Sequence, residues 1–180
     1  MYDYWKWDNE VPDWICDKLI SEIDWSTSSK AEVSEKDGTP SINENVRISN
    51  VAWKENYSPI GCIAQTFVKM ANKSANWNYD LNSCSKIQIG KYEQHGKYDW
   101  HMDNDFKGNV NNSVRKLSIS ILLNDDFEGG EFEFKKQNLD VTLKKGSILV
   151  FPSYLEHRVA PVVSGVRYSA VAWVSGPPFK

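Results

Sequence analysis

The chain has 180 residues, of which 41% are hydrophobic and 13% aromatic, so it can bury the core of one domain. Its net charge of −3 argues against a general nucleic-acid binder or a binder of anionic membranes, because such proteins present a basic surface. No window is apolar enough to span a bilayer, and the first residues lack the apolar stretch of a signal peptide.

Cysteine usage points to a reducing compartment. Cys16, Cys62 and Cys84 are odd in number and far apart, and no Cys-x-x-Cys is present. This pattern supports neither a disulfide framework nor a zinc knuckle. We therefore expect a cytoplasmic protein with no membrane partner, and a monomer.

The first half of the chain predicts two helices. Residues 11–23 open with Pro12 and Asp13 and then place Ile15, Leu19 and Ile23 four apart, as in an amphipathic helix. Residues 26–45 are rich in small polar and charged side chains and predict a surface loop without chemistry. Residues 58–71 repeat apolar side chains at three and four positions, which predicts a second amphipathic helix. We expect both helices to pack on the outside of a sheet.

From Ser85 onward the apolar period becomes two, which predicts seven or eight strands. In one of them, Leu117, Ile119, Ile121 and Leu123 share a face, while Ser118, Ser120 and Leu122 look toward something small or polar. Strands are also expected at 87–92, 132–134, 141–143, 147–151, 158–161 and 167–174. The fold class is α+β, mainly β: a jelly roll with N-terminal helices on one sheet. We expect one domain over 1–180, with 1–84 as support and 85–176 as the core.

Three side chains in this half could bind one metal ion. His101 and Asp103 are two apart, so on a strand both leave the same face. His157 follows in a second apolar segment. Two imidazoles and one carboxylate form the facial triad of non-haem Fe(II) oxygenases, which leaves metal positions open. A His-x-Asp pair alone often arises by chance, but the chain has only three histidines and two of them stand at these places.

Strand parity supplies an independent test of this site. Arg167, Ser169, Val171 and Trp173 share one face of the last strand, so Arg167 is inside if the interior holds a metal. An interior arginine is costly unless it meets an anion, and its planar fork suits a carboxylate. The alternative is that Arg167 lies on the solvated face of an edge strand.

With these residues in hand, the sequence resembles the Fe(II)/2-oxoglutarate-dependent dioxygenases, and within them the prolyl-4-hydroxylase-like branch. The resemblance covers about Ser85 to Gly176. It rests on the His-x-Asp pair, the distant His and an Arg ten residues beyond it. Supporting pieces are Gln88-x-x-x-Tyr92, Tyr98, Asn104, Gly129-Gly130-Glu131-Phe132, Lys145-Gly146-Ser147 before Phe151-Pro152, and Arg167-x-Ser169.

The resemblance implies roles for individual residues. His101, Asp103 and His157 would bind Fe(II), and Arg167 would bind the distal carboxylate of 2-oxoglutarate. The remaining cofactor-site residues would be Tyr92 and Tyr98 as hydrogen-bonding and wall residues, Ser169 or Ser118 as a helper to Arg167, and Val159 and Trp173 as packing. Leu122 stands where some relatives have a tyrosine that holds the same carboxylate. Arg115, Asn104 and Trp173 are candidates for substrate contact, although Arg115 could equally be a surface charge.

The resemblance also implies a reaction, in which 2-oxoglutarate and dioxygen are converted to succinate and carbon dioxide while an unactivated C–H bond is hydroxylated. Ascorbate is the expected reductant. The branch that repairs alkylated nucleic acid has a second arginine six residues after the first, where this chain has Trp173, so no nucleic-acid substrate is expected.

The substrate expected from the resemblance is peptidyl proline, with residues 107–113 as a candidate loop over the groove. A free amino acid or another small metabolite is the alternative. Two other classes stay open: a jelly-roll module that binds metal without turnover, and a zinc hydrolase with the same triad. Dependence on oxygen and on Arg167 separates them from the oxygenase.

Overall fold

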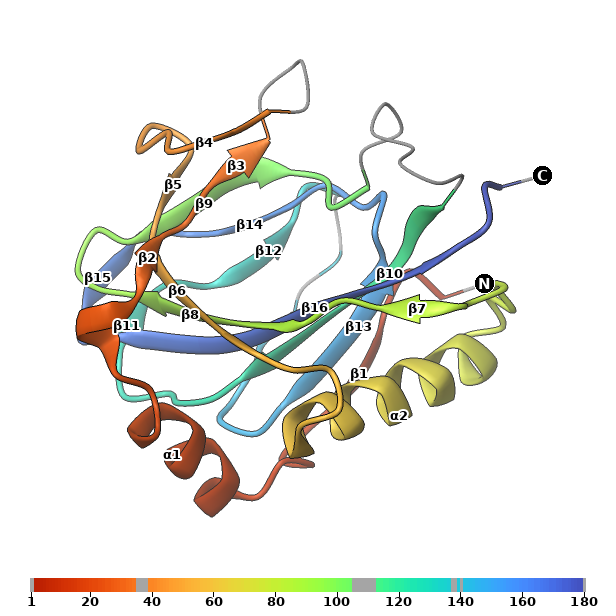
Figure 1. Ribbon diagram of the computed structural model, residues 1–180, viewed down its shortest axis with the longest axis horizontal. Helices are drawn as coiled ribbons and strands as arrows, with labels where there is room; N and C mark the ends of the chain where they lie inside the picture. Colours follow the sequence, from red (N-terminus) through yellow and green to blue (C-terminus); the bar gives the residue numbers. More distant parts are fainter. Residues whose placement is uncertain (1, 35–38, 105–112, 137–138, 140, 180) are drawn as a thin grey trace.

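Two antiparallel β-sheets face each other, and two helices cover the outer side of the larger one (Figure 1). This computed structural model describes residues 2–34, 39–104, 113–136, 139 and 141–179. The facing sheets enclose the inward side chains of alternating strands, as in other β-sandwiches. The mainly β architecture with helices on one sheet confirms the predicted jelly roll.

The larger sheet has the order β1-β13-β10-β16-β8-β6-β2, with β7 paired to β16. Its strands are β1 (Trp5–Trp7), β2 (Ser29–Lys30), β6 (Asn50–Lys54), β7 (Ser83–Cys84), β8 (Ile87–Tyr92), β10 (Val114–Leu122), β13 (Ile148–Pro152) and β16 (Arg167–Gly176). At its centre, Ile119 of β10 pairs with Val150 on one side and Ala172 on the other. All three are buried, as expected for a central strand covered on both faces.

The smaller sheet has the order β12-β14-β9-β5. Its strands are β5 (Arg47–Ile48), β9 (Lys97–His101), β12 (Phe132–Phe134) and β14 (His157–Val159). Two short pairs complete the strands: β11 (Glu128–Gly129) with β15 (Val162–Ser164), and β3 (Val33–Ser34) with β4 (Pro40–Ser41). The smaller sheet therefore presents strands from both halves of the chain to the larger one.

Both predicted helices are present, as α1 (Asp13–Ser21) and α2 (Pro59–Ser74). Ser58 caps α2 by accepting a hydrogen bond from the backbone N–H of Gly61, and Pro59 occupies the first turn, where its missing N–H costs nothing. The buried stripe of α2 packs on the outer face of the larger sheet and consists of Ile60, Ala64, Val68 and Ala71. None of the described helices combines the length and hydrophobicity that a membrane span requires.

Two predictions about local structure were wrong. Residues 26–45, predicted as a loop, contain the end of a 3-10 turn (Trp25–Thr27) and the short strands β2, β3 and β4 within their described part. Residues 141–143, predicted as a strand, have no strand partner. Instead Val141 packs with Phe132, Phe134, Leu149 and Phe151, so its apolar pattern reflects burial rather than strand pairing.

Gly146 holds the turn before β13 in a conformation that favours glycine. Its φ is +77°, and its carbonyl accepts hydrogen bonds from the backbone N–H groups of Glu10 and Val11. A Cβ at this position would lie 2.4 Å from the carbonyl oxygen of Val11. We expect Gly146→Ala to lower the free energy of unfolding by about 2 kcal/mol or more.

Chemical denaturation measures this loss. Lys145→Ala is the matched control because it changes the neighbouring residue but removes only the half-exposed ion pair with Asp17, which contributes little. Equal destabilisation by both substitutions would contradict the role of backbone conformation at Gly146.

Candidate metal and 2-oxoglutarate site

Two neighbouring strands of the smaller sheet bring the histidines together. His101 is the last residue of β9, His157 is the first of β14, and the two are paired in register. Asp103 lies beyond the end of β9, in a bend where its N–H donates to the carbonyl of Ser153. The prediction that strand parity aligns His101 with Asp103 was therefore wrong in its mechanism, although the two side chains do converge.

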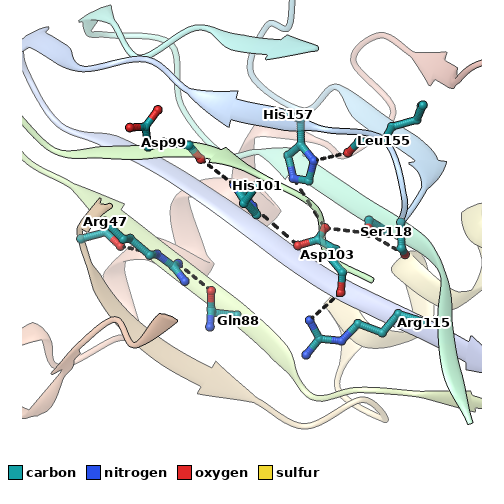
Figure 2. A network of polar contacts seen from close by, with 11 residues as sticks. Arg47, Gln88, Asp99, His101, Asp103, Arg115, Ser118, Leu155 and His157 are labelled. Atoms are coloured by element: carbon teal, nitrogen blue, oxygen red, sulfur yellow. Dashed lines mark hydrogen bonds and ion pairs between the residues drawn. The ribbon is translucent and has the colours of Figure 1, made fainter. Parts of the chain in front are cut away.

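The three side chains surround one point between the sheets (Figure 2). The distance from His101 Nε2 to Asp103 Oδ1 is 3.6 Å, and that from His157 Nε2 to Asp103 Oδ2 is 3.5 Å. All three donor atoms lie within 4.8 Å of one another. Two imidazole nitrogens and a carboxylate at this spacing suit a first-row divalent metal such as Fe(II).

The backbone sets the tautomer of both histidines. Nδ1 of His101 lies 2.8 Å from the carbonyl oxygen of Asp99, and Nδ1 of His157 lies 2.8 Å from that of Leu155 (Figure 2). A carbonyl oxygen only accepts, so each Nδ1 carries the proton and each Nε2 offers its lone pair to the shared point. A hydrogen bond of this kind from the outer ring nitrogen orients an imidazole that binds a metal ion through its other nitrogen.

Charge at the site also suits a cation. Burial, with a further contribution from His157, lowers the pKa of His101 to about 3, so this imidazole is neutral at physiological pH. Burial alone would raise the pKa of Asp103, but the two histidines and the Ser118 hydroxyl outweigh it and keep that pKa below its usual value. Ser118 Oγ donates to Asp103 Oδ2 at 2.7 Å. The site therefore presents the neutral imidazole of His101 beside the negative carboxylate of Asp103.

Arg167, the first residue of β16, is buried at 2% exposure without a carboxylate among the described residues to neutralise it. Its Nη1 donates to Ser169 Oγ at 3.0 Å, and its Nε has no partner in the described part of the chain. Burial lowers the pKa of the guanidinium, but an arginine stays protonated in proteins. A buried cation with an unpaired donor fits a site that receives an anion.

Asn124 anchors the start of the strand that carries Arg167. Its Nδ2 donates to the carbonyl of Val166 at 2.6 Å, and its Oδ1 accepts from the N–H of Tyr168 at 2.7 Å. Asn124 is itself buried, so its loss leaves two backbone groups without partners.

We expect Asn124→Ala to cost about 1 to 3 kcal/mol of unfolding free energy and to weaken 2-oxoglutarate binding severalfold, because Arg167 lies between the two contacts. Asn124→Asp should cost at least as much as Asn124→Ala, because Asn124 Nδ2 also donates to Asp126 Oδ1 at 2.6 Å and a carboxylate in its place would face Asp126 and the carbonyl of Val166 without a proton to donate. Thermal unfolding and titration with 2-oxoglutarate measure both effects. An Asn124→Ala protein with unchanged 2-oxoglutarate affinity would contradict the anchoring role.

A narrow cavity of about 40 Å³ joins the triad to Arg167, and a larger one of about 270 Å³ adjoins it, with Arg167 lining both. The smaller cavity is the candidate catalytic cavity, because all three metal-binding candidates line it. The inward face predicted for the last strand also lines it: Arg167, Ser169, Val171 and Trp173. Tyr92, Tyr98 and Val159 complete its wall as the resemblance implies, while Leu122 lies in the larger cavity.

Some predicted residues lie elsewhere. Ser118 is not a helper to Arg167, because its hydroxyl contacts Asp103 and lies 2.9 Å from Ser153 Oγ. Arg115 is exposed, yet it stacks 4.1 Å above the Trp173 ring and donates to the Asp103 carbonyl. Asn104 is buried, and its N–H donates to the carbonyl of Ser153. Of the candidate loop 107–113, all but Ser113 lie outside the described residues.

Several residues that line the cavity had no predicted role in the site. Arg47 and Gln88 line it from different sheets, and Phe132 stacks on the His157 ring with centroids 5.3 Å apart. Tyr98 stacks in the same way on His101 at 3.4 Å, so each imidazole lies against an aromatic ring. An inward position of Arg47 could have been predicted from the alternation of Arg47, Ser49 and Val51, which are all buried. The strand that carries Arg47 is too short for this pattern to be convincing alone.

A sequence profile of the 2OG-Fe(II) oxygenase superfamily matches residues 87–175, the segment that carries the triad and Arg167. This segment belongs to the superfamily. A PKHD-type hydroxylase from Synechococcus sp. (strain CC9311) is 33% identical over 111 residues, which are 56% of this chain and 49% of the relative. The chain thus spans about half the length of the curated relatives that it matches.

Two solved structures of superfamily members share the fold. The viral collagen prolyl hydroxylase vCPH from Paramecium Bursaria Chlorella virus-1, solved with 2OG, superposes with a TM-score of 0.74 and 20% identity over 97% of each chain. A Pseudomonas putida prolyl-4-hydroxylase gives a TM-score of 0.72 and 19% identity over 97% of this chain and 92% of that one. At this identity the likeness establishes the fold alone.

Proposed function

We propose that this oxygenase hydroxylates an unactivated C–H bond, with peptidyl proline as substrate. In the overall balance, substrate, 2-oxoglutarate and dioxygen give the hydroxylated substrate, succinate and carbon dioxide. The observation that carries the proposal is Arg167, a buried cation without a carboxylate partner among the described residues, lining the same cavity as the His-Asp-His triad. A purely structural metal site would not require a buried, unneutralised arginine beside it.

The residues present fit both small ligands. His101, Asp103 and His157 would hold Fe(II), because their donor set is that of the facial triad. Arg167 would hold the distal carboxylate of 2-oxoglutarate through its unpaired donors, with Ser169 orienting the guanidinium. Bound Fe(II) would supply the activation of dioxygen for oxidative decarboxylation and C–H hydroxylation, and ascorbate would keep it reduced.

The protein's own contribution would be orientation and the exclusion of water. Phe132, Phe151 and Val159 line the cavity beside the triad and leave little room for solvent. The two backbone carbonyls hold the imidazole rings in position before any ligand arrives. The proposed division of the chain follows: 85–176 as catalytic core and 1–84 as support, with Arg47 as a contribution of the support to the cavity.

Two measurements test the proposal. Adding 2-oxoglutarate to the anaerobic Fe(II) protein should produce a metal-to-ligand absorption band, and succinate release should depend on oxygen in a screen of proline-containing peptides and free amino acids. Absence of the band at full iron loading would favour a binding module. Turnover in zinc without oxygen would favour a hydrolase.

A further inference from the structure

Arg47 is a second buried arginine in the catalytic cavity. It lies on β5 at the edge of the smaller sheet and is 6% exposed. Its Nη2 donates to Gln88 Oε1 at 2.7 Å, its Nε donates to Ser49 Oγ at 3.0 Å, and its Cζ lies 4.5 Å above the Tyr98 ring. Tyr98 in turn stacks on His101, so Arg47 is one aromatic ring away from a metal-binding candidate.

The contact with Arg47 fixes the orientation of the Gln88 amide. A guanidinium has donors only, so the oxygen of Gln88 must face it and the amide nitrogen must point away (Figure 2). Gln88 lies on β8 of the larger sheet, and this bond therefore bridges the two sheets across the cavity. Neither Gln88 Nε2 nor Arg47 Nη1 donates to a described residue.

Several donors on the cavity wall have no acceptor among the residues that the structure describes. No described residue places a carboxylate within ion-pairing distance of Arg47, whose two side-chain partners are neutral. The indole Nε1 of Trp173, on the same wall, is buried without a partner in the described part of the chain. In the proposed reaction 2-oxoglutarate neutralises Arg167, which leaves the positive charge of Arg47 for another ligand. Buried charge of this kind is costly unless an anion meets it.

We propose that Arg47 and Gln88 recognise a carboxylate of the substrate that is hydroxylated. This inference rests on the proposed function and deepens it by naming a substrate class. The class consists of substrates in which a carboxylate group lies close to the residue that is hydroxylated. The carboxylate can come from an acidic neighbour in a peptide, from the end of a peptide, or from a free amino acid. Arg47 would donate through Nη1 and Gln88 through Nε2, two donors side by side for two oxygens.

Matched probes distinguish these sources. They are the capped neutral peptide acetyl-Gly-Ala-Pro-Ala-Gly-amide, its counterpart with Glu after the proline, acetyl-Gly-Ala-Pro with a free carboxylate, and L-proline. Binding to the anaerobic protein loaded with Fe(II) and 2-oxoglutarate is measured by calorimetry, and turnover by succinate release. We expect at least one carboxylate probe to bind about tenfold or more tightly than the capped peptide.

Three variants assign that preference to the pair. Arg47→Met should reduce it to within about twofold, and Arg47→Lys should keep part of it because the charge remains. Gln88→Glu should abolish the preference for carboxylate probes, because the new carboxylate pairs with Arg47. The same ion pair should allow this variant to fold even if Arg47→Met does not. Arg158→Met is the control: Arg158 also stacks on an aromatic ring, Trp100 at 4.7 Å, and pairs with Glu133, but it does not line the cavity.

The outcomes separate the inference from the proposed function. If the 2-oxoglutarate absorption band forms but no carboxylate probe binds more tightly than the capped peptide, the inference is wrong and the oxygenase assignment stands. The inference is also wrong if Gln88→Glu retains the preference, or if Arg158→Met loses it equally. If the band itself fails to form, the proposed function is wrong.

Discussion

Arg167→Ala should weaken 2-oxoglutarate binding about a hundredfold or more. The substitution removes the buried cation that lines the cavity with the triad, and the loss of one partner from a buried charge pair typically costs 2 to 5 kcal/mol. The measurement is the absorption band of the anaerobic Fe(II) protein, titrated with 2-oxoglutarate. Arg167→Lys should recover part of the affinity, because a point charge remains but the planar fork is lost.

Removing the charge of Arg167 should not lower the stability of the ligand-free protein, although it abolishes 2-oxoglutarate binding. Without a ligand, Arg167 is a buried charge whose only side-chain hydrogen bond within the described part of the chain is to Ser169. Arg167→Met should therefore unfold no earlier than the wild-type protein when both are free of ligand, even though it no longer binds 2-oxoglutarate. Tyr168→Phe, on the opposite face of the same strand, is the control for binding. Loss of binding together with a large drop in melting temperature would point to misfolding.

Metal binding should stabilise the wild-type protein and leave Asp103→Ala unchanged. A metal that binds only the folded state at about a thousand times its dissociation constant adds about 4 kcal/mol to stability. Anaerobic Fe(II), or Mn(II) as a redox-stable substitute, should thus raise the melting temperature of the wild type. Asp103→Ala removes the one negative donor between the two histidines and should abolish the shift.

Asp99→Asn is the matched control for this experiment. Asp99 is an exposed carboxylate two residues before His101, and among the described residues its side chain accepts only from the N–H of Trp100. Because its backbone carbonyl, not its side chain, orients His101, the metal-induced shift should persist. A shift that survives in Asp103→Ala would place the metal elsewhere.

The sequence predicted the β-rich half well because period two follows directly from burial on alternate faces. The inward positions of Arg167, Ser169, Val171 and Trp173 came from that rule alone. Asp103 shows where the rule ends. The position of Asp103 depends on a hydrogen bond to Ser153, which lies 50 residues later in the chain. The local sequence of residues 97–104 does not indicate that contact.

The same limit explains the other failures. Arg47 lies on a strand of two residues that is defined by its pairing with β9, so no local pattern is long enough to indicate it. Ser118 has the small polar character expected for its face, but its partner depends on where Asp103 turns. Local periodicity thus gives the side of a strand on which a residue lies, whereas the partner it meets comes from contacts between distant segments.

Arg47 reaches the cavity on β5, while every metal-binding candidate and Arg167 come from β9 onward. Arg47, which would select the substrate together with Gln88, thereby comes from a different segment of the chain than the residues that would oxidise it. Exchanging β5 and its flanking residues between related oxygenases is then a route to redirect selectivity while the reactive centre stays intact.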